Sequence, residues 1–123
     1  MKVFIADDSA TVRERLITML SELEGIEIVG QAQDAVEATK AILELKPDVA
    51  ILDIRMPGGS GIDTLRNIKR VTPAPKVIML TNYPYPQYRK RCLDAGADFF
   101  FDKSSEFHKV TEVLEQMMQD CRA

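Results

Sequence analysis

The 123-residue sequence has no tryptophan, one histidine and only two cysteines. Cys92 and Cys121 lie far apart and outside any Cys-x-x-Cys pair, so we expect reduced thiols in a cytoplasmic protein and no disulfide. No apolar run approaches the roughly 18 residues of a membrane-spanning helix, and no signal peptide is evident. The formal net charge of −3 is too small to indicate a nucleic-acid or membrane surface.

Glycine-rich phosphate loops are also missing. Neither G-x-x-x-x-G-K-[ST] nor G-x-G-x-x-G occurs, which argues against a nucleotide held on such a loop. The sequence has no internal repeat, linker or low-complexity segment, and its length suits one domain with a single core. We therefore expect one domain over residues 1–123, with no output domain in this chain.

Short apolar runs alternate with longer amphipathic segments along the whole chain. Most of the runs are rich in β-branched residues or Phe and lack clean alternation, which is typical of strands buried on both faces. They are residues 3–6, 26–29, 49–52, 77–80 and 99–101. A strand–helix order repeated five times, joined by right-handed crossovers, predicts a doubly wound α/β domain with a five-stranded parallel sheet.

The segments between the runs have the spacing of helices. The second helix is expected to begin at Asp34 and to stop at Pro47. Its expected apolar face consists of Val36, Ile42, Leu43 and Leu45. The fourth helix can begin only around Pro86 and ends at Gly96, and its apolar face is thin.

Reactive side chains follow four of the five strands. The first strand ends at Asp7 and Asp8, the third at Asp53, the fourth at Thr81 and the fifth near Lys103. In a doubly wound sheet strands one and three are neighbours, and chemistry collects beyond the carboxyl ends of the strands. The three aspartates are therefore expected to converge.

Converging carboxylates need a positive partner, because two unit charges about 4 Å apart repel by roughly 4 kcal/mol at an effective dielectric constant of about 20. Mg²⁺ suits such a site, since it takes oxygen ligands from one or two carboxylates and a phosphate. No Cys or His falls nearby to favour a softer metal. With a lysine and a threonine hydroxyl added, the site can neutralise and orient a phosphoryl group.

Four motifs in order, at strand ends along the full length, closely resemble the response regulator receiver domain of bacterial two-component signalling. They are "ADDSATVR", "LDIRMPGGSG", "MLTN" and "AGADFFFDKS". The resemblance implies a flavodoxin-like sheet of order 2-1-3-4-5 with five helices. It also implies that a histidine kinase or histidine phosphotransfer protein phosphorylates Asp53, and that the modified domain changes its affinity for a protein target not identified by the sequence.

The same resemblance implies roles for individual residues. Asp7, Asp8, Asp53 and the backbone carbonyl of Arg55 would bind Mg²⁺. Thr81 would hydrogen-bond the phosphoryl group and Lys103 would pair with it. Phe100 stands at the position of an aromatic switch residue, and Asn82 and Tyr83 stand at the rim beside Arg55.

The sequence departs from the family pattern in two places. Ser104 follows Lys103 where proline is frequent, so we expect a trans peptide bond there, because a cis bond before serine costs about 3 kcal/mol. Asn82 is larger than the small residue usual after the threonine.

Other functions remain open. The chain could be the receiver part of a longer DNA-binding transcriptional regulator. An aspartyl-phosphate hydrolase of the haloacid dehalogenase type is disfavoured, because Arg55 occupies the place of its second aspartate. A flavin-binding module on the same sheet lacks an aromatic pair placed for the flavin. We expect no enzyme activity beyond self-catalysed phosphotransfer and autodephosphorylation, and no direct contact with nucleic acid or membrane.

Overall fold

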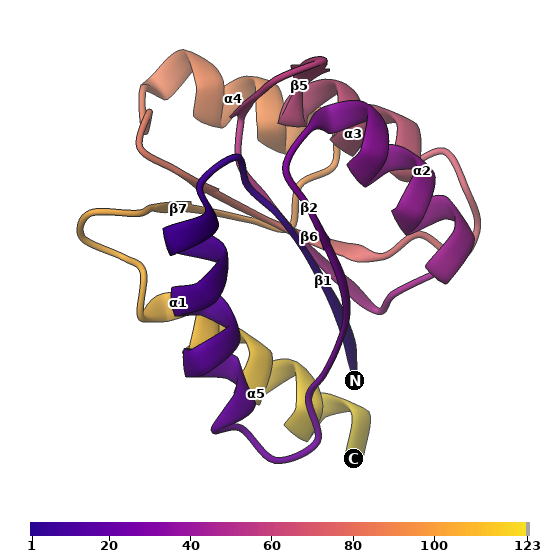
Figure 1. Ribbon diagram of the computed structural model, residues 1–123, viewed down its shortest axis with the longest axis vertical. Helices are drawn as coiled ribbons and strands as arrows, with labels where there is room; N and C mark the ends of the chain where they lie inside the picture. The colour runs from indigo at the N-terminus through magenta and orange to yellow at the C-terminus, as the bar shows by residue number, and fades with distance from the viewer. Residues whose placement is uncertain (123) are drawn as a thin grey trace.

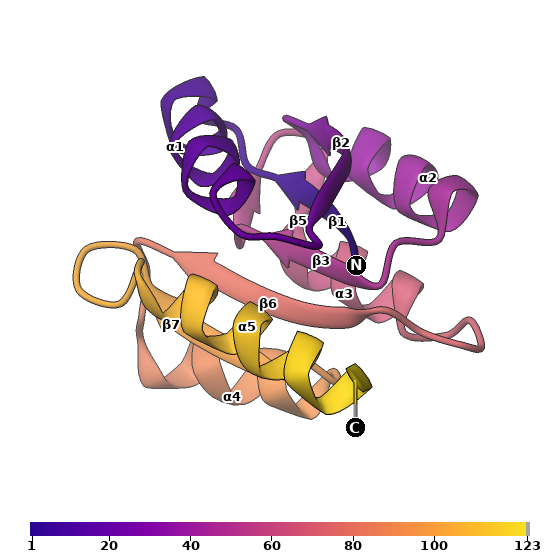
Figure 2. The same ribbon diagram turned by 90° about the horizontal axis from the view of Figure 1, so that it is seen from below.

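The computed structural model describes the backbone of residues 1–122 and the side chains of residues 1–120. Five parallel strands form one sheet of order β2-β1-β3-β6-β7, so the predicted fold class and strand order are confirmed. The strands are β1 (Lys2–Ala6), β2 (Glu27–Ala32), β3 (Val49–Leu52), β6 (Lys76–Thr81) and β7 (Phe99–Asp102). β2 and β7 lie at opposite edges of the sheet (Figure 2).

Five helices cover the two faces of the sheet (Figure 1). One face carries α1 (Ala10–Ser21) and α5 (Lys109–Arg122), and the other carries α2 (Ala35–Leu45), α3 (Gly61–Ile68) and α4 (Pro86–Asp94). None of the helices within residues 1–122 has the length and apolarity to cross a bilayer. The side chain of Cys121 lies outside the described residues, whereas Cys92 is a free buried thiol whose pKa is raised by burial to about 11.

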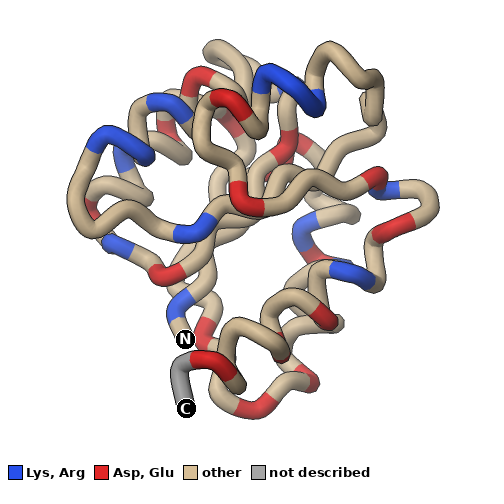
Figure 3. Tube along the Cα trace, turned by 180° about the vertical axis from the view of Figure 1, so that it is seen from behind, with Lys and Arg blue, Asp and Glu red and all other residues tan. Residues whose placement is uncertain are grey.

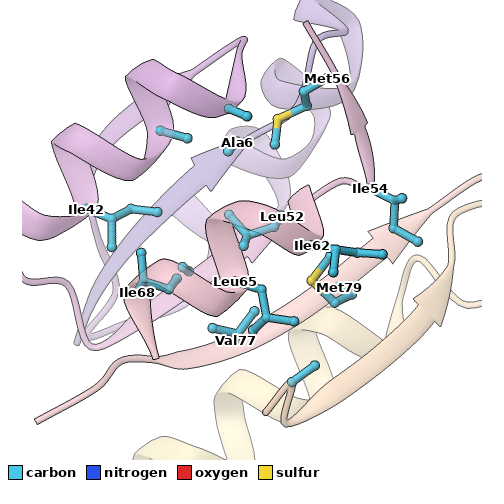
Figure 4. Packing of buried hydrophobic residues seen from close by; sticks show 14 of the residues in the cluster. Ala6, Ile42, Leu52, Ile54, Met56, Ile62, Leu65, Ile68, Val77 and Met79 are labelled. Carbon is cyan, nitrogen blue, oxygen red and sulfur yellow. The ribbon is translucent and has the colours of Figure 1, made fainter. Parts of the chain in front are cut away.

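Each face of the sheet has its own core, because the strand residues alternate between the two sides. Figure 4 shows the core under α2, α3 and α4, where Leu52 and Val77 of the sheet meet Ile42, Leu65 and Ile68 of the helices. All five are at most 2% exposed. The central strands are therefore buried on both sides, as their unbroken apolar runs predict.

The predicted apolar face of α2 is wrong at three of its four residues, since only Ile42 is buried. Val36, Leu43 and Leu45 are 66%, 39% and 44% exposed. The buried side of α2 consists of Ala35, Ala38 and Ile42. These positions also recur at helical spacing, and their mostly small side chains let the helix lie close to the sheet and to α3. Packing distance, rather than hydrophobicity, decides which face turns inward here.

A short antiparallel hairpin between β3 and α3 was not predicted. It consists of β4 (Arg55–Met56) and β5 (Gly59–Ser60). Gly58 and Gly59 supply the turn with φ values of 80° and 139°, which side chains rarely adopt. Gly61, the first residue of α3, is needed for a different reason: a Cβ there would lie 1.7 Å from the carbonyl oxygen of Asp53.

An ion-pair cluster lies at the amino end of β6, remote from the carboxyl ends of the strands. The Asp98 carboxylate accepts hydrogen bonds from Lys69 Nζ at 2.8 Å and from the Val77 N–H at 2.9 Å. Burial opposes its ionisation, but the bonds from Lys69 and Val77 outweigh burial and hold the pKa of Asp98 below its ordinary value. Asp98 thus joins α3 to the start of two strands.

We predict that Asp98→Ala lowers the free energy of unfolding at neutral pH by about 2 kcal/mol, the range for hydrogen bonds to a charged group. Because the folded state lowers this pKa, the contribution is complete above the unfolded value of about 3.9 and is lost as the pH falls through the folded value. Urea unfolding of both proteins from pH 7 to pH 3 checks this. A difference that is constant over the whole range contradicts the assignment.

Candidate metal and phosphoryl site

The paired acids at the end of β1 have opposite exposures. Asp7 is 2% exposed, whereas Asp8 faces solvent. The Asp7 N–H donates to the carbonyl of Ala32 at 3.1 Å, and Asp7 Oδ1 accepts from the Ser9 N–H at 2.9 Å. Ser9 also caps α1, with its hydroxyl accepting from the Val12 N–H. Strand end and helix start together fix where the Asp7 carboxylate lies.

Asp53 follows β3 directly and is 4% exposed. Its N–H donates to the Ala6 carbonyl at 3.0 Å, so its backbone continues the pairing with β1. Its Oδ1 accepts from the Ile54 N–H at 2.7 Å. The absence of a side chain at Gly61 lets the start of α3 approach the Asp53 carbonyl. Gly61 is thus a packing requirement of the site that its sequence position did not reveal.

Lys103 reaches both buried aspartates from the end of β7. Its N–H donates to the Thr81 carbonyl at 2.8 Å, which anchors it beside β6. Its Nζ lies 2.5 Å from Asp7 Oδ2 and 3.0 Å from Asp53 Oδ2. With the side chains of all three residues at most 7% exposed, the ammonium group is enclosed between two carboxylates.

Burial dominates the electrostatics of this cluster. It raises the pKa of Asp53; the charge of Lys103 lowers that pKa without cancelling the effect, and the nearby Asp7 carboxylate raises it further. Burial acts to lower the pKa of Lys103, but the hydrogen bond to Asp7 and the charge of Asp53 outweigh it, so the pKa of Lys103 is raised. Lys103 therefore stays charged, and its single positive charge does not fully neutralise the carboxylates of Asp7 and Asp53.

The three aspartates fit a hard cation. Asp7, Asp8 and Asp53 each offer a carboxylate oxygen, and these oxygens lie within 4.8 Å of one another. An all-oxygen set that combines buried and exposed carboxylates suits Mg²⁺, which keeps several of its waters. Arg55 begins β4, two residues after Asp53. The part of its backbone carbonyl in the metal site stays a prediction.

Thr81 lies at the same edge of the sheet. It is fully buried, and its partner in the register with β7 is Asp102, the residue before Lys103. Its hydroxyl oxygen accepts a hydrogen bond from the Tyr83 N–H at 3.0 Å. The hydroxyl still has its own proton to donate, so Thr81 can serve an anionic oxygen at the site.

Two large side chains meet at the rim. The guanidinium of Arg55 lies over the ring of Tyr83, with 4.1 Å from its Cζ to the ring centroid. Arg55 is exposed and Tyr83 is half-buried, whereas Asn82 faces solvent. The structure therefore brings two of the three predicted rim residues into contact with each other.

Phe100 and Ser104 flank Lys103 in the sequence. Phe100 is 4% exposed and lies beneath Arg89, whose guanidinium donates to its carbonyl at 3.3 Å. Its role as a switch residue stays a prediction. The Lys103–Ser104 bond is trans, as expected. Ser104 donates from both its N–H and its hydroxyl to Asp102 Oδ1, which closes a turn that needs a backbone N–H at this position.

Mg²⁺ is expected to raise the melting temperature, because it relieves repulsion in the acidic cluster. Binding to the folded state alone contributes roughly 1.4 kcal/mol at ten times Kd. Asp8→Ala should raise the stability of the metal-free protein and reduce its response to Mg²⁺. Thermal melts with EDTA or millimolar Mg²⁺ measure both effects. Glu14→Ala, which removes an exposed carboxylate from α1, is the control, and a wild-type melting temperature that Mg²⁺ does not move counts against the site.

Residues of both charge signs are scattered along the chain in the view of Figure 3. The fold and site define the class: a doubly wound α/β protein with an acidic, lysine-closed site at the carboxyl edge of its sheet. The sequence profile described as "Response regulator receiver domain" matches residues 3–115. The chain belongs to the response regulator receiver domain family, which confirms the family inferred from the four motifs.

Relatives and a solved structure agree with this assignment. The response regulator GacA of Pseudomonas aeruginosa is 32% identical over 117 residues, which cover 95% of this chain and 55% of GacA. Protein-glutamate methylesterase/protein-glutamine glutaminase 1 of Carboxydothermus hydrogenoformans is 39% identical over 120 residues, covering 96% of this chain and 35% of that protein. This chain therefore spans about half or less of the length of these two proteins.

The fold is also similar to that of a solved receiver structure. The isolated REC domain of RcsB from Salmonella enterica serovar Typhimurium, solved in the presence of phosphomimetic BeF3−, has a TM-score of 0.88 and 28% identity. The match covers 97% of this chain and 88% of that one.

Proposed function

We propose that this domain is a Mg²⁺-dependent phosphoacceptor switch in which Asp53 receives a phosphoryl group from a phosphohistidine on a histidine kinase or phosphotransfer protein. One observation carries the proposal. The Asp53 carboxylate is buried, lies 3.0 Å from Lys103 Nζ and shares a 4.8 Å cluster with Asp7 and Asp8. The phosphomimetic used with the RcsB domain supports the same chemistry here.

The transfer needs positioning and charge neutralisation more than covalent help. A carboxylate oxygen of Asp53 attacks phosphorus, the N–P bond breaks, and the histidine ring leaves with the bonding electron pair and takes up a proton. Bound Mg²⁺ would supply charge neutralisation for the phosphoryl oxygens. Lys103, held in place by Asp7, supplies a second positive charge. The product is an acyl phosphate, which is reactive, so the modification is transient.

The output of the switch is a change in partner binding. Moving a two-state population from 1:99 to 99:1 takes roughly 5.5 kcal/mol of differential interaction. New charge-assisted hydrogen bonds from Lys103 and Thr81 to the phosphoryl oxygens supply part of that energy. α4 is the element expected to move, because Cys92 is its only fully buried residue and its N-terminus has no side-chain cap. The proposed downstream partner is a protein, and the proposed location of the domain is the cytoplasm.

A second candidate rests on chain length. Because this chain spans 55% of GacA and 35% of the methylesterase, the same switch can act on an output domain of a longer protein. In that case DNA binding or an enzyme activity belongs to the other domain. The receiver over residues 1–123 itself contributes only its own phosphorylation and dephosphorylation.

Intact-mass spectrometry tests the proposal. The protein incubated with acetyl phosphate or phosphoramidate should gain one phosphoryl mass with Mg²⁺ and none with EDTA. Addition of phosphorylated histidine kinase should give the same product faster. A protein that gains no mass from any of these donors in Mg²⁺ refutes the proposed function.

The rim should control the lifetime of the acyl phosphate, because hydrolysis needs a water in line with the P–O bond. Arg55 lies two residues after Asp53 and stacks on Tyr83, and we infer that this pair of large side chains limits access to the acyl phosphate. We predict that Arg55→Asn and Tyr83→Ala each raise the hydrolysis rate about tenfold, which corresponds to about 1.4 kcal/mol of barrier. Release of labelled phosphate measures this. Arg70→Asn is the control, since it makes the same exchange at an exposed arginine just after α3. Unchanged rates in both rim variants reject the shielding.

A further inference from the structure

Arg13, at the end of the first turn of α1, makes two contacts that the proposed phosphotransfer does not use. Its Nη1 donates to the backbone carbonyl of Asp7 at 2.7 Å, and its Nε donates to Gln31 Oε1 at 2.9 Å. The side chain is half-buried. One guanidinium therefore joins the turn that carries the acidic pair to the neighbouring strand β2.

These contacts complete the restraint of Asp7. Its N–H is bound to Ala32, its carboxylate to Ser9 and Lys103, and its carbonyl to Arg13. The peptide unit that contains this carbonyl also contains the N–H of Asp8, so its orientation sets the direction in which the exposed Asp8 side chain leaves the turn. The Asp8 side chain is solvent-exposed and is not held by surrounding packing, so the direction of its carboxylate depends on this peptide unit.

We propose that Arg13 is a positioning residue for the Mg²⁺ site: it holds the Asp7–Asp8 peptide so that both carboxylates face the same cation. The inference rests on the proposed Mg²⁺ site. Arg13 donates to a backbone carbonyl, so it does not compete with the cation for a carboxylate oxygen. The planar fork of arginine matters, because it spans Asp7 and Gln31 at once and a lysine ammonium cannot.

Charge and geometry predict opposite results, which makes the proposal testable. Arg13 adds a positive charge beside the turn that carries Asp7 and Asp8, so by charge alone its removal strengthens Mg²⁺ binding. If Arg13 positions the site, its removal weakens binding, and partners that orient metal ligands typically contribute 10- to 100-fold in affinity. The sign of the change separates the two roles.

The experiment is calorimetric titration of the full chain with Mg²⁺ at fixed ionic strength. Arg13→Lys keeps the charge and Arg13→Gln removes it, and both should weaken Mg²⁺ binding about tenfold. Gln31→Leu, which changes no charge, should weaken it less. Arg15→Gln is the matched control: it removes the same charge from the same helix, but Arg15 stacks on Phe107 and should leave binding unchanged or slightly stronger.

A second measurement separates positioning from general damage. The rate of labelling by acetyl phosphate should need more Mg²⁺ for half-saturation in Arg13→Lys, while the rate at saturating Mg²⁺ stays near that of the wild type. The proposal is overturned if Arg13→Lys binds Mg²⁺ as the wild type does, or if Arg13→Gln behaves like Arg15→Gln. A wild-type protein that binds no Mg²⁺ overturns the proposed function as well, whereas normal wild-type binding with unaffected variants overturns only the role of Arg13.

Discussion

Asp53→Asn is expected to abolish the Mg²⁺-dependent gain of phosphoryl mass and, at the same time, to raise the free energy of unfolding in Mg²⁺-free buffer. The first effect follows because an amide is not a nucleophile for phosphorus. The second follows from the electrostatics of the site. Burial and Asp7 raise the pKa of Asp53 in the folded protein, and Lys103 compensates only in part.

The sign of the stability change follows from proton linkage. An acid whose folded pKa is raised binds its proton more tightly when folded, so stability falls as the pH rises through the folded value. At neutral pH the ionised Asp53 therefore costs stability, and a neutral asparagine of the same shape avoids that cost. Lys103 keeps its contact with Asp7 in the variant. Active sites commonly give up stability for function in this way.

Intact mass and urea unfolding in EDTA measure the two effects on one preparation. Asp94→Asn provides the control, because Asp94 is an exposed carboxylate at the end of α4. It should accept label and unfold as the wild type does. Labelling of Asp53→Asn at the wild-type rate would place the acceptor at another residue. If Asp53→Asn is less stable than the wild type, the attraction of Lys103 for the ionised Asp53 outweighs the cost of burying that carboxylate.

The sheet could be predicted because its central strands are buried on both faces and therefore read as unbroken apolar runs. β3 was predicted with the bounds that it has, Val49–Leu52. The edge strand β2 was predicted less well: residues 26–29 were expected, whereas the strand is Glu27–Ala32. Three of its six residues are half-exposed, and its carboxyl half, Gly-Gln-Ala, has no large apolar side chain to signal a strand. Knowing where strands end was enough to bring the aspartates and Lys103 to one edge.

Features that depend on size or on single contacts could not be read from such patterns. The buried side of α2 is built largely on alanine, whereas hydrophobicity favoured Val36 and Leu43. The β4–β5 hairpin has strands of two residues, too short for any periodicity. Arg13 contacts a backbone carbonyl. Every residue has such a carbonyl, so the sequence does not reveal which one Arg13 binds. The role of Gly61 depends on how closely α3 approaches Asp53.

Lys103→Met is expected to cause the largest loss of stability of any substitution at the site. Among the side chains of residues 1–120, Lys103 is the cation paired with both Asp7 and Asp53, and its removal leaves two buried carboxylates without a positive partner. Breaking a buried ion pair by removing one member costs about 3–5 kcal/mol, and uptake of a proton by one carboxylate places the expected loss near 3 kcal/mol. The matched control is Lys76→Met. Lys76 is 63% exposed and 3.7 Å from Asp98, and surface pairs of this kind contribute about 0–1 kcal/mol.

Two additional measurements tie that loss to the acidic cluster rather than to lost packing. Mg²⁺ should stabilise Lys103→Met more than it stabilises the wild type, because the cation then neutralises carboxylates that no lysine already serves. The double variant Lys103→Met/Asp53→Asn should recover part of the loss, since its remaining buried charge is that of Asp7 alone, and coupling between residues in contact is what a double-mutant cycle measures. Urea unfolding of the four proteins with EDTA and with Mg²⁺ gives both comparisons. Additive effects of the two substitutions, together with an equal Mg²⁺ response in all four proteins, would mean that Lys103 supports the fold through its aliphatic chain and that its charge has no structural role.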